Sequence, residues 1–189
     1  MRLFVAFDLP SAVRNALATL AQRLKPECRA ARWVRAESMH VTLKFLGETD
    51  EQKLPELRAA LAPIRSAEPV AMDFRVLGFF PNEFKPRVLW CGVQATPNLA
   101  ELAAAVEEAL EPLGIVRETR TFSPHLTLAR LEPDDALENL VRAADALKSY
   151  DFGAARESEF HLFESVLKPS GAQYSKLAVF PFVDRKSVV

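Results

Sequence analysis

The chain has 189 residues, of which 49% are hydrophobic and 26% are charged, and its formal net charge is −1. This is the composition of an ordinary globular protein, and the length allows one or two compact units. The near-zero charge excludes the broad basic surface with which proteins hold long nucleic acids. We therefore expect local charges to meet any phosphorylated ligand, and we expect no extended duplex as a partner.

The N-terminal segment and the cysteines indicate a cytoplasmic protein. The opening MRLFVAFDLP is too short for a secretory signal and is interrupted by Asp8 and Pro10. No apolar run is long enough to span a bilayer. Cys28 and Cys91 lack the spacing of metal ligands, so we interpret both as free thiols, with Cys91 buried in the apolar VLWCGV.

The first half of the chain predicts alternating strands and helices. Apolar residues recur at helical spacing after Ser11, which stands at the N-cap position of the first helix. The expected elements are, in order, a strand at residues 3–7, a helix at 12–24, a strand that begins at His40, a helix at 51–64 and a strand at 70–79.

The second half repeats this order. HVTL at His40 and HLTL at His125 are 85 positions apart, and the apolar runs LFVAF and VLWCG are separated by the same offset. The expected elements are a strand at residues 88–92, a helix at 99–110 that ends before Gly114, a strand that begins at His125, a helix at 134–147, and strands at 156–167 and 175–182.

The repeat predicts the fold class. Two halves, approximately residues 1–80 and 87–182, are joined by the turn-rich segment 80–87. We expect one bilobal α+β domain with a pseudo-two-fold axis. Mainly antiparallel sheets are expected to line a central cleft, with the helices outside.

The two HxTL motifs predict a catalytic site. Side chains alternate along a strand, so His40 and Thr42 share one face, as do His125 and Thr127. A pseudo-two-fold axis would bring these faces together. Imidazoles titrate near neutral pH and can act as acid or base, while threonine hydroxyls can donate to phosphate oxygens. The motifs therefore predict hydrolysis of a cyclic phosphodiester, without metal or cofactor.

Other candidates receive structural interpretations. A single histidine beside apolar residues on a strand is usually a half-buried side chain, but two of the three histidines precede a threonine at equivalent places of the repeat. His161 lacks the threonine, and the offset maps it onto Val76, so we interpret it as structural. Four aromatic residues are interpreted as core or loop anchors rather than as a stacking platform for a base: Phe45, Phe79, Phe80 and Phe84.

Five segments together resemble the two-histidine phosphoesterases, specifically the RNA 2′,3′-cyclic phosphodiesterase branch, also called the LigT or 2′-5′ RNA ligase family. These segments are RLFVAFDLP, MHVTLKFLGE, RVLWCGV, FSPHLTLAR and ESVLKPSGAQY. The resemblance implies a bilobal fold and the opening of a 2′,3′-cyclic phosphate to a 2′-phosphate. It also implies that His40 is the proton donor and His125 the proton acceptor.

Two basic residues near the motifs are further candidates for phosphate binding. The resemblance implies a phosphate contact by Arg130, yet strict alternation from His125 places Ala129 on the catalytic face. The strand must therefore end, bulge or twist for Arg130 to reach the phosphate. By the same alternation Lys44 lies on the His40 face, either as a source of positive charge or as a solvated side chain at the rim.

Two other functions remain open. The chain can be a non-catalytic module that binds nucleotides or RNA, or it can join RNA ends through a 2′,5′ linkage, which is the reverse reaction. Hydrolysis is favoured because water is abundant and because no P-loop or nucleotide-activating lysine motif is present. We expect a monomer that does not bind membranes. Its ligands are RNA 3′ ends with a 2′,3′-cyclic phosphate, as in tRNA halves or oligonucleotides, or small cyclic nucleotides.

Overall fold

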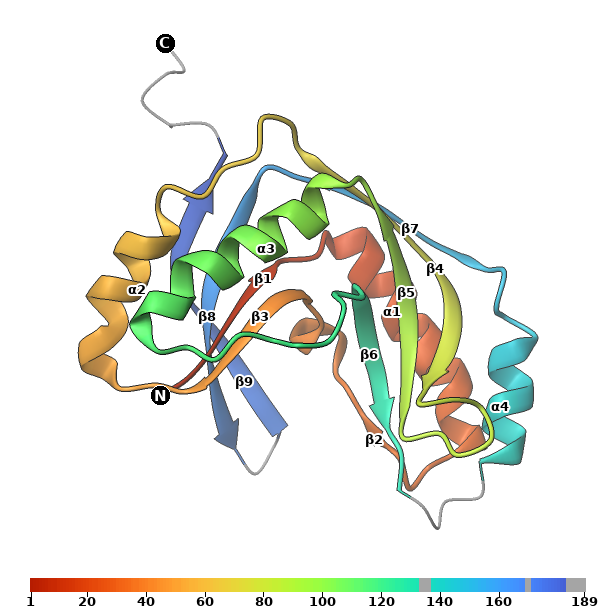
Figure 1. Cartoon of the computed structure of the whole chain (residues 1–189). Helices are drawn as coiled ribbons and strands as arrows, with labels where there is room; N and C mark the ends of the chain where they lie inside the picture. The colour runs from red at the N-terminus through yellow and green to blue at the C-terminus, as the bar shows by residue number, and fades with distance from the viewer. Residues whose placement is uncertain (133–136, 169–170, 183–189) are drawn as a thin grey trace.

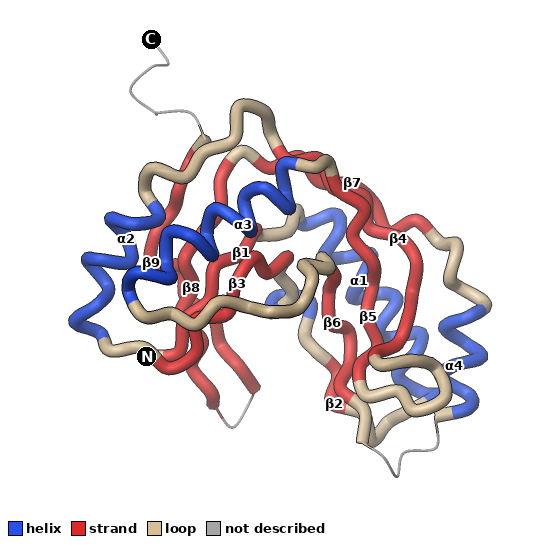
Figure 2. The backbone as a smooth tube through the Cα atoms, viewed as in Figure 1, coloured by secondary structure: helices blue, strands red, loops and turns tan. Residues whose placement is uncertain are grey.

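Two antiparallel sheets with helices on their outer faces make up the protein, as the computed structural model shows (Figures 1 and 2). The structure describes residues 1–132, 137–168 and 171–182. The expected α+β class with mainly antiparallel sheets is confirmed. No helix among these residues has the length and apolar character needed to cross a membrane.

The strands form one sheet of four and one of five. In spatial order, the four-stranded sheet contains β3 (Val41–Glu48), β1 (Arg2–Phe7), β8 (Glu159–Lys168) and β9 (Gly171–Pro181). The five-stranded sheet contains β2 (Arg32–Trp33), β6 (His125–Arg130), β5 (Val88–Ala95), β4 (Val70–Phe80) and β7 (Asp151–Glu157).

The two halves of the sequence exchange strands. β4 comes from the first half but pairs with β5 and β7 of the second. β8 comes from the second half but pairs with β1 of the first. Residues 81–87 connect β4 to β5 as a hairpin within one sheet. Each sheet is therefore completed by strands from the other half of the chain.

The helices are exchanged in the same way. α1 (Ser11–Leu24) follows β1 but packs against β7, and α3 (Asn98–Leu110) follows β5 but packs against β3. α2 (Leu54–Leu61) packs on α3, while α4 (Glu138–Asp145) packs on β4 and α1. Figure 1 shows α2 and α3 beside the four-stranded sheet and α4 at the far side of the five-stranded one.

The apolar periodicity of the helices explains this packing. The buried face of α1 consists of Val13, Leu17, Leu20 and Leu24, spaced as one side of a helix. These residues belong to one continuous core that also contains the inner residues of both sheets. The short 3-10 helices η1 (Lys25–Glu27), η2 (Ala36–Ser38), η3 (Glu51–Lys53) and η4 (Glu111–Leu113) connect the larger elements. Both cysteines are free and Cys91 is buried, as expected; Cys28 is buried as well.

Some predicted boundaries were wrong. Ser11 is the first residue of α1 rather than its N-cap, because Pro10 occupies that position and no side chain caps the helix. The single strand expected at residues 156–167 is two strands, since β7 ends at Glu157 and β8 begins at Glu159 in the other sheet. β2 was not predicted, because two residues show no periodicity.

The end predicted before Gly114 was correct, and two other predicted segments extend outside the described residues. α3 ends at Leu110 and η4 at Leu113, before Gly114, whose φ of 81° is the left-handed conformation that glycine adopts readily. The start of the helix expected at residues 134–147 falls outside the described residues; within them, α4 spans Glu138–Asp145. Pro169 and Ser170 of the late ESVLKPSGAQY segment also lie outside them.

Candidate active site

The two HxT motifs lie on strands that approach each other from different sheets. β3 is an edge strand of the four-stranded sheet, and β6 lies beside the edge strand β2 of the five-stranded sheet. β3 and β6 are in contact, and Figure 1 shows them on the facing sides of the two sheets. The fold therefore places the first motif opposite the second.

His40 is packed among aromatic rings just before β3. Its ring centroid is 4.4 Å from that of Phe163, 5.3 Å from that of Tyr174 and 5.7 Å from that of Phe4. Its Nδ1 lies 3.3 Å from the carbonyl oxygen of Ser38 at the end of η2. A carbonyl can only accept a hydrogen bond, so Nδ1 carries the proton of the neutral ring and Nε2 keeps the lone pair.

The pKa of His40 is lowered to about 4, first by burial of the ring and then by the positive charges of Arg14 and Lys176, against the opposing effect of the Ser38 carbonyl. The carboxylate of Asp8 is 3.9 Å from Nε2 and would favour the protonated ring. That carboxylate is already paired with both Arg14 and Lys176. In the free protein, the neutral form of His40 therefore predominates near neutral pH.

His125 opens β6 and repeats the backbone anchor of His40. Its Nδ1 lies 2.8 Å from the carbonyl oxygen of Ser123, again two residues earlier in the chain. Phe80 at the end of β4 meets the ring edge to face, with 5.1 Å between the centroids. Both motif histidines are therefore held through Nδ1, which leaves Nε2 of each ring as the nitrogen available for proton transfer.

A β-bulge follows the threonine in each motif. Along β3, Thr42 pairs with Ala6 and Lys44 with Val5, so Leu43 is the extra residue. Bulges of this kind shift the alternation of side chains by one position. The residue that shares the face of His40 and Thr42 is consequently Phe45, which is 70% exposed.

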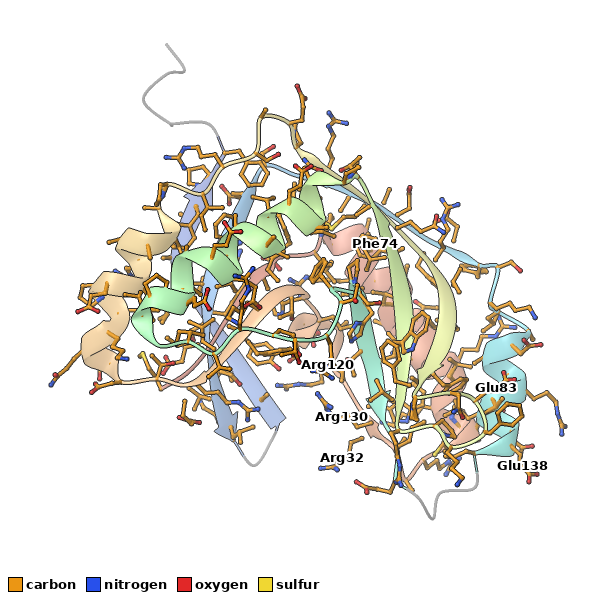
Figure 3. All side chains as sticks on the ribbon, viewed as in Figure 1. Arg32, Phe74, Glu83, Arg120, Arg130 and Glu138 are labelled. Atoms are coloured by element: carbon orange, nitrogen blue, oxygen red, sulfur yellow. The ribbon has the colours of Figure 1, made fainter. Side chains whose placement is uncertain are left out.

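The second motif has the equivalent bulge, and it changes the position of Arg130. Thr127 pairs with Trp90 and Ala129 with Leu89, so Leu128 is the extra residue. Leu128 and Ala129 are both buried, whereas Arg130 is exposed. The strand therefore bulges as required for Arg130 to join the His125 face. In Figure 3, Arg130 and Arg32 extend from the five-stranded sheet toward the four-stranded one.

Lys44 does not supply charge to this face. The bulge at Leu43 turns the Lys44 side chain toward α3, where its ammonium group lies 2.5 Å from Glu107 and 2.8 Å from the carbonyl oxygen of Val116. The side chain is buried. Both interpretations from the sequence, a charge for the phosphate and a solvated lysine, were wrong because strict alternation does not survive the bulge.

Three charged residues beside His40 were not found from the sequence. Arg14 of α1 donates to the carbonyl oxygens of Leu9 and Ala36, at 3.1 Å each, and pairs with Asp8. It thereby ties the end of β1 to η2, the turn that holds His40. Lys176 of β9 lies 2.5 Å from the other oxygen of Asp8. No local motif marks these residues: Arg14 reaches Asp8 from the first turns of α1, and Lys176 reaches it through the β1–β8–β9 pairing.

His161, which we interpreted as structural, lies near this cluster. It is buried on β8, and its Nε2 is 3.3 Å from Glu159. Burial and the charge of Lys176 lower its pKa. Its structural role stays a prediction. Phe45 and Phe84 are largely exposed, so neither is a core anchor, whereas Phe79 and Phe80 are partly buried.

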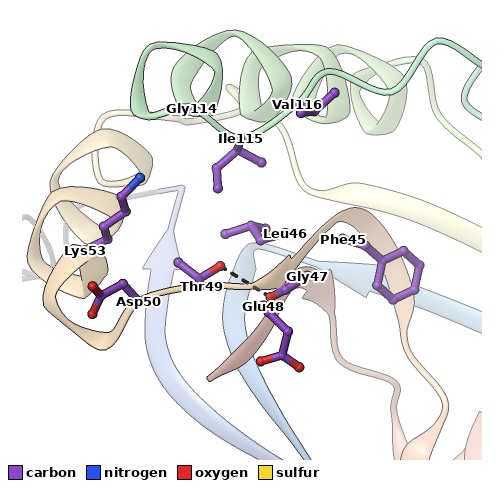
Figure 4. A pocket seen from close by; sticks show the side chains of 10 residues that line it. All are labelled: Phe45, Leu46, Gly47, Glu48, Thr49, Asp50, Lys53, Gly114, Ile115 and Val116. Atoms are coloured by element: carbon purple, nitrogen blue, oxygen red, sulfur yellow. Dashed lines mark hydrogen bonds between the residues drawn. The ribbon is translucent and has the colours of Figure 1, made fainter.

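A separate hollow of about 500 Å³ lies at the far end of β3 (Figure 4). It is lined by residues 45–50, Lys53 and residues 114–116. Neither motif histidine lines it, so it is not the predicted catalytic site. Among the described residues, no three histidine, cysteine, aspartate or glutamate side chains gather closely enough to hold a metal ion.

Comparisons with known proteins agree with the duplicated sequence. The family model for LigT-like phosphoesterases matches the chain twice, over residues 7–90 and 92–174, and each match contains one HxTL motif. The RNA 2′,3′-cyclic phosphodiesterase of Methanocaldococcus jannaschii is 34% identical over 92% of this chain and 96% of its own length. The protein with that name from Thermus thermophilus is 37% identical over 95% of this chain and 89% of its own length.

Solved structures share the fold. TT0787 of Thermus thermophilus superimposes with a TM-score of 0.78 and 30% identity, covering 96% of this chain and 98% of the other. LigT of E. coli in complex with 3′-AMP gives a TM-score of 0.76 and 25% identity, covering 97% and 98%.

The position of Lys44 gives a testable prediction for stability. Lys44→Met should lower the free energy of unfolding by about 3–5 kcal/mol, because it leaves the largely buried carboxylate of Glu107 without its partner. The double variant Lys44→Met/Glu107→Met should recover most of the loss, since an apolar pair replaces the ion pair. Urea unfolding measures both. If the single variant were fully stable but impaired in substrate binding, Lys44 would face the active site after all.

Proposed function

The chain belongs to the LigT-like phosphoesterase family, and from this premise we propose that it hydrolyses the 2′,3′-cyclic phosphate at RNA 3′ ends to a 2′-phosphate. One observation carries the proposal. Two histidines at equivalent positions of a duplicated chain are each held through Nδ1 by the carbonyl two residues earlier. This arrangement gives two Nε2 atoms for acid–base chemistry on strands that contact each other.

In the proposed reaction, Nε2 of His125 takes a proton from water as the water oxygen attacks phosphorus. Nε2 of His40 donates its proton to the ribose 3′ oxygen as the bond between that oxygen and phosphorus breaks. The phosphate stays on the 2′ oxygen. One imidazole gains the proton that the other loses, and solvent restores the starting state.

The low pKa of His40 has two consequences for this role. An imidazolium with a pKa of about 4 is a stronger acid than an ordinary one, so it gives up its proton readily once it is charged. In the free protein, however, little of it is charged at neutral pH. The bound phosphodiester carries a negative charge, which favours protonation of the adjacent ring.

The remaining groups of the site are assigned to the phosphate. Thr42 and Thr127 share the faces of the two histidines and can donate hydrogen bonds to the non-bridging oxygens. Arg130, brought to the same face by the bulge at Leu128, can add a charged contact. The protein thus supplies acid, base and phosphate donors from its own side chains, and we propose that the reaction needs no metal ion.

A chelator and product analysis test this proposal. A short oligonucleotide with a 2′,3′-cyclic phosphate should be hydrolysed at the same rate with and without EDTA. The product should be a 2′-phosphate, identified by its mobility beside 2′- and 3′-phosphate standards. Loss of turnover with EDTA that one added divalent metal restores would contradict the metal-free mechanism.

The same assay separates the alternatives. A 3′-phosphate product would reverse the assignment of the leaving group. Binding of the oligonucleotide without turnover would indicate a non-catalytic module. Ligation runs through the same groups in reverse, and a 2′,5′-linked product formed from two RNA ends would identify it.

Single substitutions test the acid–base pair. His40→Ala and His125→Ala should each lower kcat by roughly 10²–10⁴-fold, the usual effect of removing a positioned proton-transfer group. The wild-type rate should follow a bell-shaped pH profile, and each variant should lose one limb. Thr42→Ala and Thr127→Ala should cost about 1–3 kcal/mol each in transition-state stabilisation.

His161→Ala is the matched control, because it removes the third histidine of the chain. A folded His161→Ala protein should retain the chemical step. If that variant were inactive while His125→Ala kept its activity, the catalytic pair would have been misassigned.

A further inference from the structure

Lys176 is placed beside the reactive nitrogen of His40 by a shared carboxylate. Its Nζ lies 2.5 Å from Oδ2 of Asp8, and Oδ1 of Asp8 lies 3.9 Å from Nε2 of His40. One carboxylate therefore separates a lysine ammonium group from the atom that is expected to transfer a proton.

The two cations on Asp8 differ in how firmly they are held. Arg14 is 21% exposed and is fixed by the carbonyl oxygens of Leu9 and Ala36 as well as by Asp8. Lys176 is 48% exposed, and its long side chain is tied to Asp8 by an ion pair. An exposed ion pair of this kind contributes little stability, so an incoming anion can replace the carboxylate at low cost. Arg14, in contrast, would have to break contacts that position η2.

We propose that Lys176 binds the phosphate of the substrate, and that it leaves Asp8 to do so. The inference rests on the proposed function, because it takes His40 as the group beside the reacting phosphate. Lys176 is added to Thr42, Thr127 and Arg130 as a ligand of the phosphate. No covalent bond forms or breaks in this step.

The exchange also explains how a buried histidine becomes a proton donor. The titratable groups that face His40, Asp8 or the two cations on Asp8 are, element by element, Arg14 on α1, Glu37 on η2, Glu157 on β7, His161 and Glu159 on β8, and Tyr174 and Lys176 on β9. While Lys176 holds Asp8, its charge lowers the pKa of His40. Once Lys176 has moved to the phosphate, Asp8 and the phosphate anion both favour the charged ring, which takes up a proton from solvent.

The second half of the chain lacks this device. The 85-residue offset maps Asp8 onto Val93 and Arg14 onto Leu99, both apolar and buried. His125 contacts the Phe80 ring and the Ser123 carbonyl. Within the part of the chain that the structure describes, a carboxylate shared by two cations lies beside His40 and not at the equivalent positions near His125, as the division into one acid and one base requires.

Two variants of Asp8 and Lys176 should affect different kinetic parameters for the cyclic-phosphate oligonucleotide. Lys176→Met should raise KM at least about tenfold, because a charge-assisted contact with phosphate is lost. Lys176→Arg keeps the positive charge and should restore most of the lost substrate affinity. Asp8→Asn should instead lower kcat, by about tenfold for each unit that the pKa of His40 falls in the complex, since Lys176 still binds the phosphate. Lys148→Met in the turn after α4, an exposed lysine paired with Asp145, is the matched control and should match the wild type.

An NMR titration of the three histidines, assigned with His125→Ala and His161→Gln, supplies the decisive readout. In free Lys176→Met, the pKa of His40 should be higher than in the wild type, because an adjacent cation is gone. If Lys176 acted only by opposing protonation, Lys176→Met would be faster than the wild type at neutral pH, and that result would overturn the inference. An unchanged KM in Lys176→Met would also overturn the inference. A wild-type protein that does not open the cyclic phosphate would instead refute the proposed function.

Discussion

The exchange of strands between the two halves is the constraint on which the rest of the structure depends. β4 completes the sheet of the second half, and β8 completes that of the first. α1 and α3 cross over in the same direction, so a continuous core joins both sheets. The two motif strands therefore cannot separate without breaking a ladder of backbone hydrogen bonds or exposing apolar surface. A site made of residues from both halves gains a fixed geometry from this arrangement.

Equivalent positions of the two halves share their backbone geometry but differ in their surroundings. Both histidines are held through Nδ1 by a carbonyl two residues earlier, and both motifs bulge after the threonine. The bulge in β3 places Phe45 on the His40 face, and the bulge in β6 places Arg130 on the His125 face. Charges surround His40, whereas His125 has none of the corresponding residues. The proposed acid–base mechanism requires that these two chemically identical histidines differ in protonation, and their surroundings supply that difference.

The sequence patterns predicted the paired histidines and the long helices, because these depend on repeats that can be seen along the chain. The 85-residue offset paired His40 with His125, and apolar periodicity located α1 and α3. The strand exchange was not predictable, because an offset relates equivalent strands without saying which strands pair. The predicted orientation of Lys44 was wrong, because a bulge is a backbone irregularity that side-chain alternation in the sequence cannot reveal. Asp8 and Lys176 lie near opposite ends of the chain and meet only through the order of strands in the folded sheet.

The central claim is that His40 and His125 act on one phosphate in one chemical step. The most direct test is kcat/KM for the cyclic-phosphate oligonucleotide in the wild type, the two single alanine variants and the double variant. Groups that act together in one step are strongly non-additive, because removal of either already disables the step that both serve. If both histidines act in one step, the double variant is scarcely slower than the slower single variant. A double variant whose loss equals the product of the two single losses would contradict it.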